Sequence, residues 1–262
     1  SDVAGAPKPS DIIDYQERIY ATGYYNSFLF YSNIGTPTDW TNDSSSIRIP
    51  GRGRTICLYK SPDDKLLVGK EGGEVYSWDG IQLEKVTDRF GPTSRESLAS
   101  INGIYYYLNS YGIYRTGIGG VPEQISTPIE DLFTGRSGTL GSAVFGSTAG
   151  GASGYKYYCT VGTSTANLQS PTSAQNMGTA VVYDTRLNNW SIYESPFTFG
   201  AYMSFNLLNT ATNRISRDTF VIANATSGTA AARTFSFEGT AMADSGFPIN
   251  STVEVVFHAK TL

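Results

Sequence analysis

The residues that could carry out chemistry in this chain are few and scattered. His258 is the only histidine, which excludes most catalytic triads and multi-histidine metal sites because no second imidazole is available. Two adjacent carboxylate pairs, Asp63 with Asp64 and Glu130 with Asp131, invite comparison with glycoside hydrolysis, which uses two separated carboxylates. Turn formation explains the first pair better, and a helix start explains the second. The sequence therefore predicts no catalytic residue, no bound cofactor and no metal.

A basic cluster offers a second chemistry, contact with phosphate. It consists of Arg48, Arg52 and Arg54. The formal net charge of the chain is −4 and neither sign is gathered into a block, whereas nucleic-acid binders concentrate positive charge. We therefore interpret the cluster as the solvated edge of a sheet.

Aromatic and sulfur side chains could also serve recognition or redox chemistry. Three successive tyrosines at 105–107 could stack on sugars, but alternation along a strand places about half of them in the core. Cys57 and Cys159 both lie in apolar, strand-like runs. The sequence favours two buried thiols over a disulfide, because small disulfide-bonded frameworks have more cysteines at closer spacing.

The composition indicates what must position these residues. The chain has 262 residues, of which 40% are hydrophobic and 13% aromatic, with 18 Tyr, 13 Phe and 28 Gly. Aromatic side chains suit pleated, half-buried surfaces, and glycine suits tight turns. No apolar run approaches the roughly 20 residues needed to cross a bilayer. An ordered all-β protein without a membrane span is predicted.

A repeated hairpin pattern organises the sequence. Short β-rich runs ending in an aromatic alternate with Gly, Asp or Asn turns, most clearly over residues 56–86 and 97–125. Single hairpins cannot bury their apolar faces alone, so they must stack or be arranged radially. We predict a β-propeller-like array of about five blade-like antiparallel units, an incomplete ring or one with inserted loops, over residues 17–262. Residues 1–16 are predicted to be an N-terminal arm or linker.

Further local predictions concern a helix, three loops and the aromatic residues at the ends of the β runs. Pro128 and the acids after it predict a short helix over 128–133. Gly-, Ser-, Thr- and Ala-rich composition predicts an exposed loop at 135–154, and a polar insertion predicts another at 162–178. A third loop is predicted at 206–216. The aromatics that end the β runs are predicted to anchor the blades by packing, namely Trp40, Trp78, Trp190, Tyr76, Tyr114 and Tyr183.

The last strand signal lies near the end of the sequence, at residues 252–257. An unpaired strand of this kind would be an aggregation hazard. We predict that it pairs with the N-terminal unit near residues 18–23 and closes the ring, the alternative being a partner strand from a neighbouring subunit or another domain.

The order of four phrases resembles a known group of proteins. Residues 30–40, 66–76, 97–114 and 182–190 are similar, in succession, to β-propeller structural proteins of tailed bacteriophages, the tail nozzle proteins and the neck proteins that plug or stabilise packaged DNA. The resemblance extends over residues 17–260. It implies a structural role in a virion and transfers no catalytic residue.

What the resemblance implies is a ring in the phage tail or neck. The protein would be made in the host cytoplasm, assemble as a homo-oligomer, contact other tail proteins and let DNA pass during ejection without sequence-specific contact. Two alternatives stay open, because propellers host many functions. One is a carbohydrate-binding propeller that recognises a host surface, and the other is a glycoside hydrolase.

Overall fold

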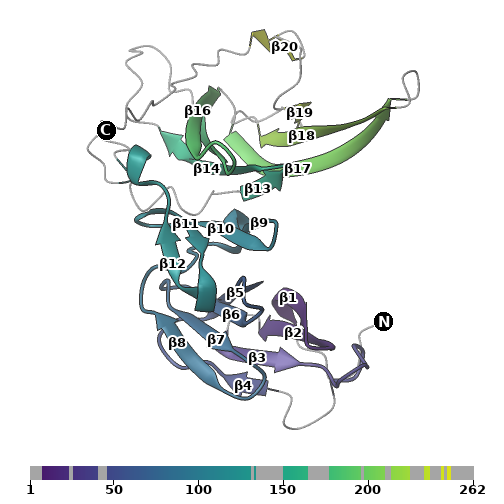
Figure 1. Ribbon diagram of the computed structural model, residues 1–262, viewed down its shortest axis with the longest axis vertical. Helices are drawn as coiled ribbons and strands as arrows, with labels where there is room; N and C mark the ends of the chain where they lie inside the picture. The colour runs from purple at the N-terminus through teal and green to yellow at the C-terminus, as the bar shows by residue number, and fades with distance from the viewer. Residues whose placement is uncertain are drawn as a thin grey trace. The chain divides into compact units, whose positions relative to one another are not determined.

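The computed structural model describes residues 8–23, 26–40, 46–130, 133, 150–164, 177–195, 198–209, 214–224, 233–236, 243–244 and 247–248 (Figure 1). The regular structure in these segments is almost entirely antiparallel β-sheet. Helical turns among them include three short 3-10 helices, Arg95–Ser97, Ile118–Gly120 and Thr127–Ile129. The all-β prediction is confirmed, and the described part of the predicted helix at 128–133 begins as the last of these 3-10 turns.

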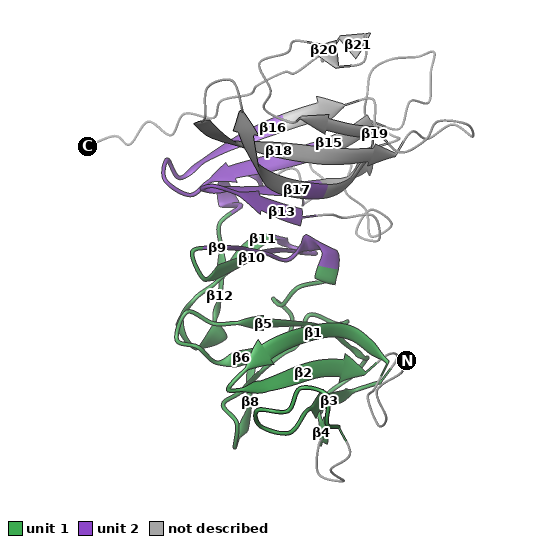
Figure 2. Ribbon diagram, turned by 90° about the vertical axis from the view of Figure 1, so that its right-hand side faces the viewer, with its two compact units in different colours: residues 1–95, 102–105, 113–125 green, residues 96–101, 106–112, 126–262 purple. Residues whose placement is uncertain are grey.

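The chain divides into two compact units (Figure 2). Unit 1 comprises Ser1–Arg95, Asn102–Tyr105 and Ile113–Ile125, and unit 2 comprises Glu96–Ile101, Tyr106–Gly112 and Ser126–Leu262. The sequence predicts a single domain over 17–262. Each unit is described below by itself.

Unit 1 contains two four-stranded antiparallel meanders. The first is formed by β1 (Pro9–Tyr15), β2 (Arg18–Gly23), β3 (Phe28–Tyr31) and β4 (Ser46–Arg48), in that order. The second is formed by β5 (Thr55–Lys60), β6 (Leu66–Lys70), β7 (Val75–Trp78) and β8 (Leu83–Thr87), also in order. Meanders of four short strands are the unit from which propeller blades are built.

The strand β1 corrects the sequence prediction of an N-terminal arm at 1–16. It pairs with β2 from Pro9 to Tyr15. Of its seven side chains, those of Asp11 and Tyr15 are buried. Because one inward position is an aspartate, no apolar alternation marks this strand in the sequence. The buried aspartate therefore interrupts the alternation of apolar and polar residues by which a strand is recognised in sequence.

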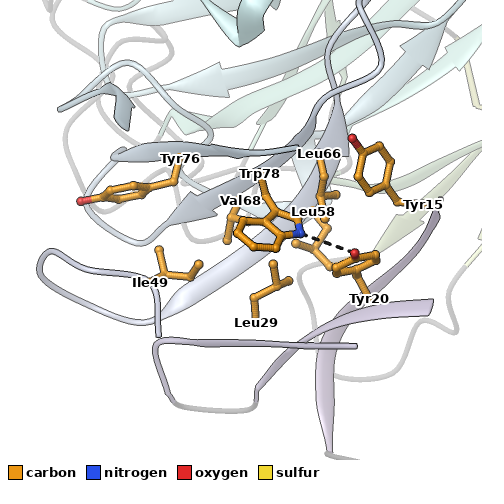
Figure 3. Packing of buried hydrophobic residues seen from close by; sticks show 9 residues of the cluster. All are labelled: Tyr15, Tyr20, Leu29, Ile49, Leu58, Leu66, Val68, Tyr76 and Trp78. Atoms are coloured by element: carbon orange, nitrogen blue, oxygen red, sulfur yellow. Dashed lines mark hydrogen bonds between the residues drawn. The ribbon is translucent and has the colours of Figure 1, made fainter. Parts of the chain in front are cut away.

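The core of unit 1 lies between its two meanders. Figure 3 shows the indole of Trp78 among aliphatic side chains, with its Nε1 donating to the Tyr20 hydroxyl at 3.4 Å. The cluster draws residues from both sheets: Tyr15, Tyr20, Leu29, Ile49, Leu58, Leu66, Val68, Tyr76 and Trp78. Burial of this apolar surface, at about 25 cal/mol per Å², is the main force that joins the two sheets.

The remaining strands form further sheets. A third four-stranded sheet has the order β12-β11-β10-β9, from β9 (Ala99–Ile101), β10 (Ile104–Asn109), β11 (Gly112–Thr116) and β12 (Pro122–Gln124). In unit 2, β13 (Gly150–Ser153), β14 (Lys156–Ser164), β15 (Met177–Asp184) and β16 (Asn189–Ser195) form a fourth meander. A three-stranded sheet contains β17 (Thr198–Asn209), β18 (Arg214–Asn224) and β19 (Arg233–Ser236), and β20 (Ala243–Asp244) pairs with β21 (Phe247–Pro248).

Three loop predictions need correction where the structure describes them. The strand β13 lies within the predicted loop 135–154, and β14 and β15 extend into both ends of the predicted loop 162–178. The hairpin of β17 and β18 occupies most of 206–216, with register kept from Leu207 to Asn209. Small and polar residues can form strands when their neighbours supply the ladder, so composition alone misled the prediction.

The ring closure predicted between residues 252–257 and the N-terminal unit falls on residues outside the described part of the chain. Within that unit, β2 is bonded on one side to β1 and on the other to β3, so both edges of β2 itself are occupied.

Candidate functional site

The carboxylate of Asp63 supports a turn and a neighbouring loop. It lies between β5 and β6, where its Oδ1 accepts a hydrogen bond from the backbone N–H of Gly119 at 2.8 Å. Hydrogen bonds from the Ser61 side chain and from that N–H lower the pKa of Asp63. Asp64 beside it has φ 57°, a left-handed conformation that aspartate tolerates in turns. This arrangement agrees with the turn interpretation of the pair.

Asp79 organises a second turn, between β7 and β8. Its Oδ1 accepts from the backbone N–H groups of Ile81 at 2.8 Å and Gln82 at 2.7 Å. These hydrogen bonds, that of Gln82 foremost, lower the pKa of Asp79. A general acid in glycoside hydrolysis needs a raised pKa instead. Asp63 and Asp79 are therefore suited to hold turns as carboxylates and poorly suited to donate a proton.

The other candidates named from sequence are dispersed. Glu130 is exposed, whereas Asp131 and His258 lie outside the described residues. Of the three tyrosines at 105–107, the last two are buried and Tyr105 is half-buried. Its ring centroid lies 5.8 Å from that of Tyr59. The structure therefore gives little of this run to an exposed stacking surface.

Both cysteines are buried thiols that form no disulfide, which confirms the prediction. Burial raises the pKa of Cys159 to about 12. The thiolate is the nucleophile and metal ligand, so Cys159 stays in its unreactive form at neutral pH.

The predicted blade anchors occupy different environments. The side chains of Trp78, Trp190, Tyr76, Tyr114 and Tyr183 are buried. Trp40 is half-buried, and its Nε1 donates to the carbonyl of Pro37 at 3.0 Å. Burial places the first five within packed sheets, and Trp40 closes a local turn.

One edge of unit 1 gathers features that the sequence prediction did not combine. Successive connections of a meander alternate between its two ends. The connections after β1 and β3 therefore share one end of the first meander, and those after β5 and β7 share one end of the second. Hydrogen bonds join these connections to each other and to the one after β11. We call this side the turn edge and define it as residues 16–17, 32–40, 61–65, 79–82 and 117–121.

Hydrogen bonds between connections make the turn edge continuous. Gly35 donates from its N–H to the carbonyl of Glu17 at 2.9 Å. Gln16 donates from Nε2 to the carbonyl of Asp79 at 3.3 Å, and Gly119 reaches Asp63 as described. Lys65 lies close enough to Asp63 and Asp79 to lower the pKa of both. The turns are thus fixed to one another as well as to their own strands.

The turn edge exposes branched aliphatic side chains at its tips. The exposed fractions are 60% for Ile34, 90% for Ile81, 77% for Ile118 and 55% for Val121. Single exposed apolar residues need no explanation, but several on one edge make it a candidate binding surface. The same five connections carry the carboxylates of Glu17, Asp39, Asp63, Asp64 and Asp79, and their basic residue is Lys65.

Sequence reasoning missed this edge although a signal was present. Turn tips are normally polar, so an isoleucine immediately after Asp79 and Gly80, or between Gly117 and Gly119, breaks the expected composition. The same departure in successive turns is a sequence signal for an edge with exposed apolar side chains.

The part of the chain that the structure describes has no metal-binding cluster and no membrane-spanning helix. No group of three or more His, Cys, Asp or Glu side chains in that part of the chain is arranged to hold a metal ion. No helix among the same residues is long and apolar enough to span a membrane.

Comparisons with known proteins add limited information. No family model matches this chain, and no curated protein matches it. Among solved structures, virginiamycin B lyase of Staphylococcus aureus is 11% identical, covering 85% of this chain and 94% of its own, with a TM-score of 0.39.

Two further structures give similar values. YCF48 bound to D1 peptide is 11% identical over 83% of this chain and 76% of its own, with a TM-score of 0.39. A Bacteroides fragilis protein described as exported is 10% identical over 82% of this chain and 66% of its own, with a TM-score of 0.42. This chain thus spans just under two thirds of that protein. Scores this low support no inference about function.

Proposed function

We propose that this chain is a non-enzymatic structural protein of a phage tail or neck, forming part of a nozzle or plug ring around the DNA passage. The observation that carries the proposal is the ordered resemblance of residues 30–40, 66–76, 97–114 and 182–190 to phage propeller proteins. In this proposal about five blade-like units make the wall, which is the usual use of repeated meanders.

The turn edge gives the proposal a contact surface. Its isoleucines would be buried against a neighbouring subunit of the ring, and hydrogen bonds between its turns would keep the surface rigid during assembly. A surface fixed before binding loses less conformational entropy when it binds. The edge therefore suits a permanent structural contact.

The charge of the chain supports passage of DNA without adhesion. A net charge of −4 and a calculated isoelectric point of about 5.1 leave no excess of cations to neutralise phosphates. Packaged DNA would slide past such a wall, because non-specific affinity for DNA depends on releasing its counterions to basic side chains.

The absence of enzymatic activity is part of the proposal. Asp63 and Asp79 have lowered pKa values and hold turns, and burial raises the pKa of Cys159. These are the states expected of structural groups rather than of a general acid or a nucleophile.

A carbohydrate-binding propeller remains the second candidate. The exposed Tyr155, at 47%, has the guanidinium of Arg186 4.6 Å from its ring centroid. Such a pair could contact a sugar face. A glycan array would detect it, and loss of the signal in Tyr155→Ala would assign the site. A glycoside hydrolase is less well supported.

The deciding experiment examines particles of a phage that encodes this sequence. Peptide mass spectrometry of purified particles should find the chain at a fixed, multi-copy ratio to the major tail protein. Particles made without it should lack part of the tail axis in electron micrographs or lose their DNA. A chain absent from purified particles would overturn the proposal.

A further inference from the structure

The side of unit 1 opposite the turn edge has its own set of connections. We call it the basic edge and define it as residues 26–28, 48–54, 71–74 and 87–91. Backbone hydrogen bonds join its parts: Thr55 N–H to Asn26 carbonyl at 3.0 Å, Glu71 N–H to Arg54 carbonyl at 3.0 Å, and Gly91 N–H to Gly73 carbonyl at 2.8 Å. It is therefore as well fixed as the turn edge.

The charges of the basic edge are partly paired within it. Arg54 lies 3.6 Å from Glu71. Lys85, from the adjoining strand β8, bridges Glu74 at 3.1 Å and also contacts Asp88. The ion pairs found among the described residues do not include Arg48 or Arg52, and both are exposed. Positive charge is consequently presented to solvent here.

Apolar surface accompanies that charge. Phe28 and Phe90 on the basic edge are exposed by 37% and 39%. The turn edge instead presents Ile81 and Ile118 beside carboxylates. One side of unit 1 thus combines arginine with phenylalanine, and the opposite side combines aspartate with isoleucine.

We propose that the turn edge of one copy binds the basic edge of a second copy of this chain, head to tail. The inference rests on the proposed function in one respect, because it identifies the contact that would build the ring. Opposite charges favour this pairing, whereas a turn edge facing another turn edge would bring carboxylates together. The isoleucines and phenylalanines supply the apolar contact that charge alone lacks.

The geometry of such a contact predicts its products. Joining two different surfaces is a heterologous interface, which closes into a ring when the rotation between copies is a whole fraction of a turn and otherwise extends as a filament. Both products contain the same contact, so the test addresses the contact itself.

The test uses complementary charge reversals in the full chain. Variant A carries Glu17→Lys and Ile81→Lys on the turn edge, and leaves the turn-holding carboxylates in place. Variant B carries Arg48→Glu and Arg52→Glu. Sedimentation velocity and native mass spectrometry at low salt should show wild-type assemblies, and dissociation constants raised at least about tenfold for A alone and for B alone.

Mixing the variants provides the decisive arm. In a mixture, each reversed edge can meet an edge of opposite charge on the other variant, so assembly should return with A and B alternating. The matched control is Ile12→Lys with Glu84→Lys, which makes the same residue changes at exposed positions outside both edges. It should assemble as the wild type does, and thermal melts should show all three variants folded.

Each failure has its own meaning. A wild-type monomer over the whole dilution series, or unchanged assembly in A and B, would overturn this interface. If the chain is nevertheless present in purified particles, the proposed function survives without it. If the charge reversals behave as expected and the particles lack the chain, the interface stands and the proposed function fails.

Discussion

The sheet β5–β8 in unit 1 and the sheet β13–β16 in unit 2 are the same meander with different cores. The first packs aliphatic side chains such as Leu58, Leu66 and Val68 around Trp78. The second is surrounded by buried tyrosines, with ring centroids 5.6 Å apart for Tyr106 and Tyr157. Backbone topology therefore does not dictate the chemistry of the core.

The tyrosine core has polar atoms that need partners. The Tyr157 hydroxyl donates to the Ser97 carbonyl at 2.7 Å, and Tyr183 donates to Oδ1 of Asn188 at 2.6 Å. Thr160 and Tyr202 share a hydrogen bond of 2.9 Å. A buried hydroxyl without a partner would cost about 1–3 kcal/mol. Unit 2 thus depends on specific hydrogen bonds, whereas the Trp78 cluster of unit 1, which has five aliphatic side chains among its nine, depends mainly on buried area.

Alkaline pH should produce the largest difference between the two cores. Burial raises the pKa of Tyr157 above 10.0, and that of Cys159 from 9.0 to about 12. Above pH 9 the unfolded chain loses these protons while folded unit 2 keeps them, so the unfolded state binds fewer protons. The stability of unit 2 should be level below pH 9 and fall from there toward pH 12.

Unit 1 contains a group whose contribution to stability changes with pH in the opposite direction. Burial lowers the pKa of Lys70 below 10.5, so its contribution to stability rises with pH up to 10.5, partly offset by the raised pKa of Tyr15. Urea midpoints between about pH 8 and pH 11 should fall less in Cys159→Ala and more in Lys70→Met than in the wild type. Equal slopes in all three would contradict the assignment.

Replacing Trp190 should strongly destabilise unit 2. Its side chain is 4% exposed, and its ring centroid lies 4.8 Å from that of Tyr183. Trp190→Ala should lower the free energy of unfolding by about 3–5 kcal/mol. Hydrogen exchange should report the loss in residues 156–192 and spare unit 1. Trp190→Phe is the graded control, and an unchanged midpoint in Trp190→Ala would show that the ring does not anchor the sheet.

The buried carboxylate of Asp11 makes polar contacts in unit 1 that should contribute to stability as much as the hydroxyl hydrogen bonds of unit 2. The Asp11 carboxylate is 4% exposed and accepts from the N–H of Leu58 at 2.8 Å and from Nε of Arg95 at 2.8 Å. Asp11→Ala leaves the Leu58 N–H without its acceptor and should cost about 2–4 kcal/mol. Faster exchange of the Leu58 amide is the local readout. Asp11→Asn keeps one acceptor and should cost less; equal losses for both would refute the hydrogen-bond explanation.

The hydroxyl of Tyr157 isolates a single hydrogen bond of the tyrosine core. Tyr157→Phe keeps the ring and removes the donor to Ser97, so it should cost about 1–2 kcal/mol in urea unfolding. The matched control is Tyr155→Phe, because Tyr155 is 47% exposed and its hydroxyl can exchange partners with water. Similar costs at the two positions would mean that the core hydroxyl has no special role.

The same contrast explains how far sequence could predict this molecule. The strands β5–β8 were predictable because apolar runs alternate with strong turn residues such as Gly72, Gly73 and Gly80. The strands β1 and β13 were not, because Asp11 and a run of small residues replace the apolar signal. Short-range patterns do not reveal partners supplied by distant segments, such as Leu58 for Asp11.

The candidate site was predictable only in parts. The turn positions of Asp63 and Asp64 followed from local residue preferences. Their assembly with Asp79 and the exposed isoleucines into one edge did not, since it depends on hydrogen bonds such as that from Gln16 to Asp79, which join turns distant in the sequence. Such contacts become visible only when the meanders are placed side by side.

Replacing Trp40 should have the smallest effect on stability. It tests whether a tryptophan beside a turn is enough to anchor a blade. Trp40 and Trp190 are both predicted from sequence to anchor blades, yet Trp40 is half-buried and bonded to Pro37 three residues away. A local hydrogen bond and a partly wet ring should contribute about 1 kcal/mol or less. Trp40→Ala should therefore shift the urea midpoint far less than Trp190→Ala. Comparable losses would mean that a tryptophan beside a turn anchors its sheet whatever its burial, and that the sequence pattern alone identifies anchors.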